Sequence, residues 1–193
     1  MEETIAVAPA LQIPGWQVHT FDQVASTMDE AHRLAAQGAP EKTLVWAARQ
    51  ALGRGRQGRA WVSPEGGAYC SLILRPSRSI AEAPQLALVA GLAAAETLRD
   101  VACLYPSIRW PNDLLIKGRK LGGILAEAKR EKCQTPYVVL GIGIKGPQHR
   151  FNEHFPVEFF FGQPKLDIEN IVGDIPCKIF MLFPEFADRT AGL

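Results

Sequence analysis

The sequence lacks the features that mark exported, membrane-spanning and metal-knuckle proteins. No uninterrupted apolar run reaches about 18 residues, the length that a helix needs to cross a bilayer. The apolar stretch at 5–13 is short and is broken by Pro9 and Gln12, so we expect neither a secretory signal nor a membrane partner. The four cysteines form no close pair, which argues against a zinc knuckle or a redox dithiol and favours a cytoplasmic protein with reduced thiols.

The chain also lacks an excess of charge of either sign. Its 193 residues carry 21 Lys and Arg against 20 Asp and Glu, a net charge of +1, and 47% of them are hydrophobic. This balance argues against a disordered chain and against a nucleic-acid binder that relies on bulk positive charge, although local basic patches remain open. No helix-turn-helix is recognisable, so no DNA partner is expected. A chain of this length buries roughly 70% of its unfolded surface, which predicts one sizeable core.

Apolar periodicity predicts a mixed β-sheet flanked by helices. A first helix is expected over 27–37, with Thr27 and Glu30 at the spacing of a capping box and Gly38 as its C-terminal cap. A longer helix is expected from Pro84 to about residue 98. Strands are expected at 44–48, 69–74, 107–110, 114–116, 121–126 and 137–144. Because few helices separate these strands, an α+β fold is favoured over a doubly wound parallel sheet.

The two ends of the chain differ from its middle. Residues 1–16 contain two prolines and no clear period, and eight of the nine phenylalanines follow Lys145 in a segment without a sustained helix or strand period. We therefore expect three parts: an N-terminal extension over 1–16, a central domain over 17–144, and an atypical C-terminal segment over 145–193 that packs on the central domain.

A run of arginine and glycine at 49–59 is the strongest local signal. It holds four arginines and three glycines in eleven residues, with no acidic side chain, and Ala60-Trp61 follow it. Glycine lets the backbone approach a ligand, and arginine donates paired hydrogen bonds to phosphate or carboxylate oxygens. The run lacks the spacing of a P-loop or of a dinucleotide-binding turn. An anion-binding loop is predicted, with a solvated basic turn or an RNA-binding segment left open.

A second cluster begins with Arg-Trp-Pro-Asn-Asp at 109–113 and continues with Lys-Leu-Gly-Gly-Ile-Leu at 120–125. Asn112 and Asp113 supply an amide and a carboxylate, which suit a ribose, a base edge or a hydrated magnesium ion. Lys120 leads into a strand whose glycines admit a ligand against the backbone. Taken alone, Asn-Asp after proline is more often an ordinary turn, and Lys120 could be an exposed turn lysine.

Together these clusters resemble the biotin protein ligase family, also called biotin–acetyl-CoA-carboxylase ligase. The family pattern Gly-Arg-Gly-Arg-x-Gly-Arg-x-Trp matches 53–61, and the pattern Trp-Pro-Asn-Asp followed by Lys-Leu-x-Gly-Ile-Leu matches the second cluster in the same order. Further likenesses are Ser26-Thr27, Gln50, and Tyr69-Cys70-Ser71 with Arg75. The resemblance covers about 20–144. It implies a class II aminoacyl-tRNA-synthetase-like catalytic domain of the biotin/lipoate ligase superfamily, a mixed sheet flanked by helices, over 17–144.

The resemblance implies an ATP-dependent biotin protein ligase, which forms biotinyl-5′-AMP and then transfers biotin to a lysine of a biotin carboxyl carrier protein. ATP and Mg²⁺ are the implied cofactors and biotin the substrate. No metal ligand is assigned in this chain, and the oligomeric state, monomer or homodimer, is left open.

The same resemblance implies roles for individual residues. The catalytic residues are Lys120 and Arg56. The biotin site comprises Ser26, Thr27, Met28, Gln50, Arg54, Gly55, Arg56, Lys120 and Gly123. The nucleotide site comprises Arg56, Arg59, Trp61, Asn112, Asp113 and Lys120. These residue types suit the chemistry because two anions must meet before they react, and a loop dense in arginine offsets their repulsion.

One departure from the family pattern lies at the end of the last predicted strand. Family members continue Gly-x-Gly-Ile with asparagine, whereas Lys145 follows 141–144 here. A cation thus replaces an amide expected near the nucleotide or metal. Two other functions stay open: a lipoate or octanoate protein ligase of the same superfamily, and a non-catalytic protein that binds biotin, adenylate or RNA.

Overall fold

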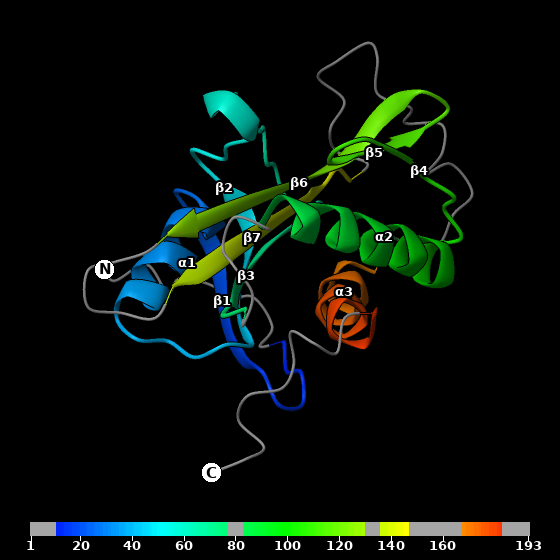
Figure 1. The fold of residues 1–193 in the computed structure, drawn as a ribbon. Coiled ribbons are helices and arrows are strands. Elements are labelled where there is room, and N and C mark those ends of the chain that lie inside the picture. The colour runs from blue at the N-terminus through cyan, green and yellow to red at the C-terminus, as the bar shows by residue number, and fades with distance from the viewer. Residues whose placement is uncertain (1–10, 77–82, 130–135, 147–166, 183–193) are drawn as a thin grey trace.

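A seven-stranded sheet with helices on both faces forms the centre of the molecule (Figure 1). The structure, a computed structural model, describes residues 11–76, 83–129, 136–146 and 167–182. The strands are β1 (Gln17–Val24), β2 (Thr43–Gln50), β3 (Ala68–Leu74), β4 (Ser107–Arg109), β5 (Asp113–Ile116), β6 (Arg119–Lys129) and β7 (Tyr137–Ile144). The helices are α1 (Thr27–Ala36), α2 (Ala83–Ala102), α3 (Ile168–Leu182) and the short η1 (Arg56–Gly58).

The strand order is β1-β2-β3-β7-β6-β5-β4. Only the β1–β2 pair is parallel among the paired strands that the structure describes, and the other neighbours run antiparallel. The α+β prediction is therefore confirmed. None of the described helices is long and apolar enough to cross a membrane.

The two faces of the sheet bury different helices. On β2, Leu44 and Trp46 belong to the core under α2 and α3, while Val45 between them belongs to the core under α1. This alternation follows from the two-residue period of a strand. On the α1 side, Met28, Ala31 and Ala35 are buried against the sheet. The other side is larger, and Figure 1 shows α2 and α3 next to each other on it.

The start of α1 corrects the predicted capping box. Ser26 is the N-cap and makes no side-chain capping bond. The backbone N–H of Thr27 donates instead to Gln50 Oε1 on β2, at 2.8 Å, and Glu30 pairs with Arg33 one turn further along. The capping-box prediction is wrong because a distant side chain satisfies the helix end that a local one was expected to satisfy.

Helix α3, strand β1 and the short η1 are the described elements that the sequence did not predict. The expectation of no sustained helix in 145–193 is wrong for 168–182, where α3 buries four apolar residues spaced as one helix face. They are Ile171, Val172, Ile175 and Ile179. Gly173 and Pro176 interrupt the helical signal because both have poor helix propensity. This part of the C-terminal segment packs against α2 in the main core.

Candidate active site

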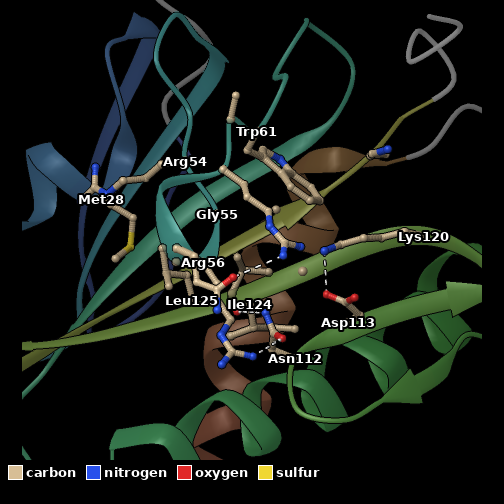
Figure 2. Close-up of a pocket in the computed structure, with 18 of the residues that line it drawn as sticks. Met28, Arg54, Gly55, Arg56, Trp61, Asn112, Asp113, Lys120, Ile124 and Leu125 are labelled. Carbon is tan, nitrogen blue, oxygen red and sulfur yellow. Dashed lines mark hydrogen bonds and ion pairs between the residues drawn. The ribbon is translucent and has the colours of Figure 1, made fainter. Parts of the chain in front are cut away.

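A single cavity of about 620 Å³ collects the residues assigned from the sequence. Strands β6 and β7 form its floor, the start of α1 and the arginine–glycine loop close two sides, and the turn before β5 closes another (Figure 2). Every residue that the sequence assigned to the biotin or nucleotide site lines it: Ser26, Thr27, Met28, Gln50, Arg54, Gly55, Arg56, Arg59, Trp61, Asn112, Asp113, Lys120 and Gly123. Their individual roles remain predictions.

The arginine–glycine loop is folded back on itself. The backbone N–H of Gly55 donates to Arg59 O at 2.7 Å, and that of Trp61 donates to Gly53 O at 2.8 Å. A Cβ at position 53 would lie 2.4 Å from the carbonyl oxygen of Trp61. Glycine is required at 53 because no side chain fits this close backbone approach.

A chain of hydrogen bonds runs through the buried polar groups at one end of the cavity. Ser71 Oγ donates to Thr27 Oγ1 at 2.8 Å, and Thr27 Oγ1 donates to Gln50 Oε1 at 3.1 Å. Gln50 Nε2 then donates to Ser63 Oγ at 2.8 Å, and Ser63 Oγ donates to the carbonyl oxygen of Trp61 at 3.0 Å. The chain links β3, α1, β2 and the loop, so this end of the cavity is polar, buried and held in place.

The side chain of Arg54 points away from the loop and connects the loop to α1 and β6. Its guanidinium contacts Asp29 Oδ1 on α1 at 2.5 Å, Glu127 Oε2 on β6 at 3.2 Å and Ser26 Oγ at 3.2 Å. Burial alone would lower the pKa of Arg54, but the hydrogen bonds and charges of the two carboxylates raise it. Arg54 is therefore a fixed cation at the α1 side of the cavity.

Arg56 reaches across the cavity to the turn before β5. Its Nη1 donates to Asn112 Oδ1 at 3.1 Å, the contact drawn in Figure 2. Asn112 is itself fixed by two bonds to Ile124 on β6, from Nδ2 to the carbonyl oxygen at 2.8 Å and from the Ile124 N–H to Asn112 O at 2.9 Å. The loop thus closes over the middle of the cavity through one arginine.

Lys120 and Asp113 form an ion pair at the floor, with Lys120 Nζ 2.6 Å from Asp113 Oδ1. Arg109 Nη2 contacts the other carboxylate oxygen, also at 2.6 Å. Burial would raise the pKa of Asp113, but hydrogen bonds from these two cations lower it, so the carboxylate stays ionised.

Trp61 lies on the bare backbone of β7. A Cβ at Gly143 would come within 2.7 Å of Trp61 Nε1, so only glycine permits this contact. The indole also meets Lys120, whose Nζ is 5.3 Å from the ring centroid (Figure 2). Trp61 Nε1 is buried and has no hydrogen-bond partner in the described part of the chain.

Positive charge dominates the cavity. Six of its lining side chains are Lys or Arg and one is Asp, although the whole chain carries a net charge of only +1. Within the described residues, no three His, Cys, Asp or Glu side chains stand together as a metal-binding group. The cavity is therefore built for anions, and its one lining carboxylate already binds two cations.

Sequence reasoning did not assign six residues that take part in the site: Ser63, Ser71, Arg109, Glu127, Gly141 and Lys145. Gly141 leaves room for Met28, since a Cβ there would lie 2.5 Å from Met28 Sδ in its present position. Ser71 stands out in the sequence as a hydroxyl inside an apolar run. Glu127 carries no comparable signal because its partners lie on α1 and the loop.

Comparisons with known proteins agree with this geometry. The sequence profile of the Biotin/lipoate A/B protein ligase family matches residues 20–145. The chain is 42% identical over 144 residues to the bifunctional ligase/repressor BirA of Bacillus subtilis, an alignment that covers 74% of this chain and 44% of that protein. It is 41% identical over 122 residues to the biotin–[acetyl-CoA-carboxylase] ligase of Paracoccus denitrificans, which covers 62% of this chain and 50% of that protein. The chain thus spans half or less of the length of these relatives.

Solved structures show the same likeness. The biotin protein ligase of Aquifex aeolicus in complex with biotin and ATP superposes with a TM-score of 0.69 at 28% identity, over 88% of this chain and 71% of that one. The biotin protein ligase of Leishmania major in complex with biotinyl-5-AMP gives 0.71 at 26% identity, over 88% and 76%. On its fold, its cavity and the match over 20–145, the chain belongs to the biotin/lipoate A/B protein ligase family.

Proposed function

We propose that this chain is an ATP-dependent biotin protein ligase, with residues 17–144 as its catalytic domain and a biotin carboxyl carrier protein as its acceptor. The observation that carries the proposal is the concentration of six cationic side chains around one cavity in a nearly neutral chain. A site with that charge suits the joining of two anions, a carboxylate and a triphosphate. The relatives in Aquifex and Leishmania, solved with biotin and ATP or with biotinyl-5-AMP, support it.

The first step joins biotin to the nucleotide. A carboxylate oxygen of biotin attacks the α-phosphorus of ATP, the bond from that phosphorus to the bridging oxygen breaks, and pyrophosphate leaves with the bonding electrons. Lys120 at the floor and Arg56 on the loop approach the middle of the cavity from opposite sides. Their charges offset the repulsion between the two reactants and stabilise the negative charge that builds on the α-phosphate.

The second step transfers biotin to the carrier. The unprotonated amine of a carrier lysine attacks the acyl carbon of the mixed anhydride, and an amide bond forms. AMP leaves with the electrons of the broken C–O bond, and the nitrogen gives up one proton to water. The contact between Arg56 and Asn112 closes the loop over the middle of the cavity. This closure limits the access of water to the anhydride before the amine arrives.

The buried polar network favours biotin over lipoate as the acyl substrate. Thr27, Gln50 and Ser71 place hydrogen-bonding groups beside Met28 at the α1 end of the cavity. The ureido ring of biotin has donors and acceptors for such groups, whereas the dithiolane ring of lipoate has none. A site built for hydrogen bonds discriminates strongly against a ligand that leaves them unmade.

Magnesium binds together with ATP in this reaction and is not a resident metal of the chain. The carboxylates around the cavity are engaged by cations: Asp113 by Lys120 and Arg109, and Glu127 by Arg54. Phosphate oxygens and water would supply most of the ligands of the ion that accompanies the nucleotide. When bound, the ion would neutralise part of the triphosphate charge. The cytoplasmic location expected from the sequence stays a prediction.

The direct test is to incubate the purified chain with ATP, magnesium, biotin and a biotin carboxyl carrier domain. We expect pyrophosphate release that depends on biotin, and a carrier whose mass increases by one biotinyl group. Lipoate in place of biotin should give neither product. The proposal is wrong if neither biotin binding nor biotin-dependent pyrophosphate release is found, or if lipoate replaces biotin with greater efficiency.

A pair of lysine variants sharpens this test. Lys120→Gln removes the charge at the cavity floor and should lower the rate of adenylate formation by about 10²–10³-fold, the usual effect of losing one stabilising donor. Lys117→Gln is the matched control because Lys117 is an exposed residue of the β5–β6 turn outside the cavity lining. Equal rates of adenylate formation for the two variants would show that Lys120 takes no part in the reaction.

A further inference from the structure

Two lysine side chains lie close to the indole ring of Trp61. Lys120 on β6 and Lys145, the residue that follows β7, both line the cavity. Their Nζ atoms lie 5.3 Å and 5.8 Å from the centroid of the indole ring. The backbone N–H of Lys145 donates to Leu121 O at 2.8 Å, which fixes this residue beside the start of β6. Two ammonium groups therefore converge on one aromatic ring at one end of the cavity.

This end of the cavity carries more positive than negative charge. Asp113 is the one carboxylate among the described lining residues, and it already binds Lys120 and Arg109. Lys145 is half-buried, and burial followed by the charge of Lys120 lowers its pKa. Both effects oppose the charged form of Lys145, and an anion bound near the two ammonium groups would offset both.

The order of residues along β7 places Lys145 relative to the rest of the site. Gly141 packs under Met28, which belongs to the proposed biotin end, and Gly143 packs under Trp61. A strand advances about 3.3 Å per residue, so the backbone of Lys145 is about 13 Å from that of Gly141. Lys145 therefore lies beyond Trp61, at the end of the cavity away from the acyl substrate.

We infer that Lys145 binds the β- and γ-phosphates of ATP and the pyrophosphate that leaves. This inference rests on the proposed ligase function and names a binding residue that the family pattern, with its asparagine, does not predict. The leaving group gains charge as the bond to the α-phosphorus breaks, and an ammonium group beside it stabilises that charge. Lys120 stays with the reacting α-phosphate, and Lys145 holds the part of the nucleotide that departs.

The test compares two nucleotides that differ in these phosphates. Binding of α,β-methylene-ATP and of AMP to the biotin-saturated chain is measured by calorimetry at a fixed magnesium concentration. Lys145→Met should weaken the binding of α,β-methylene-ATP by about tenfold or more and leave AMP within about twofold, since a lost charge contact costs 1.4 kcal/mol or more. Lys145→Arg keeps the charge and should retain most of the affinity.

Lys129→Met is the matched control because Lys129 is an exposed lysine at the far end of β6. It should bind both nucleotides like the parent chain. If Lys145→Met lowers the two affinities equally, or changes neither, the inference is wrong. If Lys145→Met fails to fold, as judged by thermal unfolding, Lys145→Gln compared with Lys145→Arg gives the same contrast. A parent chain that binds no biotin would instead contradict the ligase function itself.

Discussion

At the scale of single residues, Glu127 is the group that organises the α1 side of the cavity. Its carboxylate receives the guanidinium of Arg54 and lies 2.9 Å from His32 Nε2. Burial would raise the pKa of Glu127, but the hydrogen bonds from Arg54 and His32 lower it. The ionised carboxylate accepts from both neighbours, so His32 carries its proton on Nε2.

The state of His32 predicts a pH dependence of stability. His32 Nδ1 is buried without a hydrogen-bond partner among the described residues, so a second proton there would have no acceptor. Burial accordingly lowers the pKa of His32 below its usual 6.5, although Glu127 opposes this. The unfolded chain binds this proton at a higher pH than the folded chain. The contribution of neutral His32 to the free energy of unfolding should therefore be complete above about pH 6.5. It should be lost as the pH drops through the lower pKa of the folded state.

Urea denaturation between about pH 7.5 and pH 5 measures this effect. His32→Gln replaces the ring with a group that does not titrate, so the variant should lose less unfolding free energy than the parent over this range. The fall below pH 4.5 that arises from Glu127 should remain in both proteins. Parallel pH profiles for parent and variant would show that His32 does not titrate as argued.

Some residues of this site are recognisable in the sequence and others are not. The arginine–glycine loop and the Asn-Asp turn were recognisable because anion-binding residue types are consecutive there. Glu127 was not, since it acts through a distant partner, Arg54. The hydroxyl of Ser71 stands out in an apolar run, but its distant partner Thr27 does not follow from the sequence. Nothing local in a sequence encodes such pairs.

At the scale of elements, β7 is the strand on which the cavity is built. Its glycines at 141 and 143 leave room for Met28 and Trp61 from two other segments. Gly143→Ala would place a methyl group 2.7 Å from Trp61 Nε1, so the indole must move off the strand. We expect nucleotide affinity to fall about tenfold, within the range of losing an aromatic platform, while biotin affinity stays within about twofold.

Calorimetry with biotin and with AMP, together with tryptophan fluorescence, measures both effects. Gly91→Ala in α2 is the matched control, since the nearest atom to a Cβ there is 3.8 Å away and the helix lies outside the cavity. That variant should bind both ligands normally and gain about 0.5–1 kcal/mol of stability. Unchanged AMP binding and fluorescence in Gly143→Ala would show that the indole position does not matter.

Most elements were predictable because their signals are local. Helix α1 and strands β3 and β7 agree with the expected ranges to within about one residue. Strand β1 was missed because it is an edge strand of partly exposed residues without clear alternation. Helix α3 was missed because its helical conformation is imposed by packing against α2, which overrides the poor propensity of Gly173 and Pro176.

At the scale of the whole molecule, α3 joins the C-terminal segment to the main core. Ile175 is fully buried in that core, whereas Met181 on the same helix is 78% exposed. Ile175→Ala should lower the free energy of unfolding by about 2–5 kcal/mol, because it removes buried methyl groups and leaves a cavity. Met181→Ala should change it by less than about 0.5 kcal/mol.

Denaturant unfolding of the two variants, with the catalytic assay as a second readout, tests whether α3 folds with the domain. A single cooperative transition shifted by Ile175→Ala means that the helix is part of one folding unit. The two variants could instead have equal stabilities, or Ile175→Ala could shift only a separate transition at low denaturant. Either result would mean that 168–182 folds as a unit apart from the sheet.

The register of β6 and β7 has a consequence for how this scaffold changes its substrate. Gly123 and Gly143 stand directly opposite each other, so the surface beneath Trp61 consists of main chain whose amides belong to the ladder between the two strands. Such a surface offers a flat shape and no side chain of its own to a ligand. Under the proposed function, selectivity among acids therefore resides in the side chains around this floor, among them Thr27, Gln50 and Ser71. Substitutions there, more than in β6 and β7, would redirect the site to a different acid.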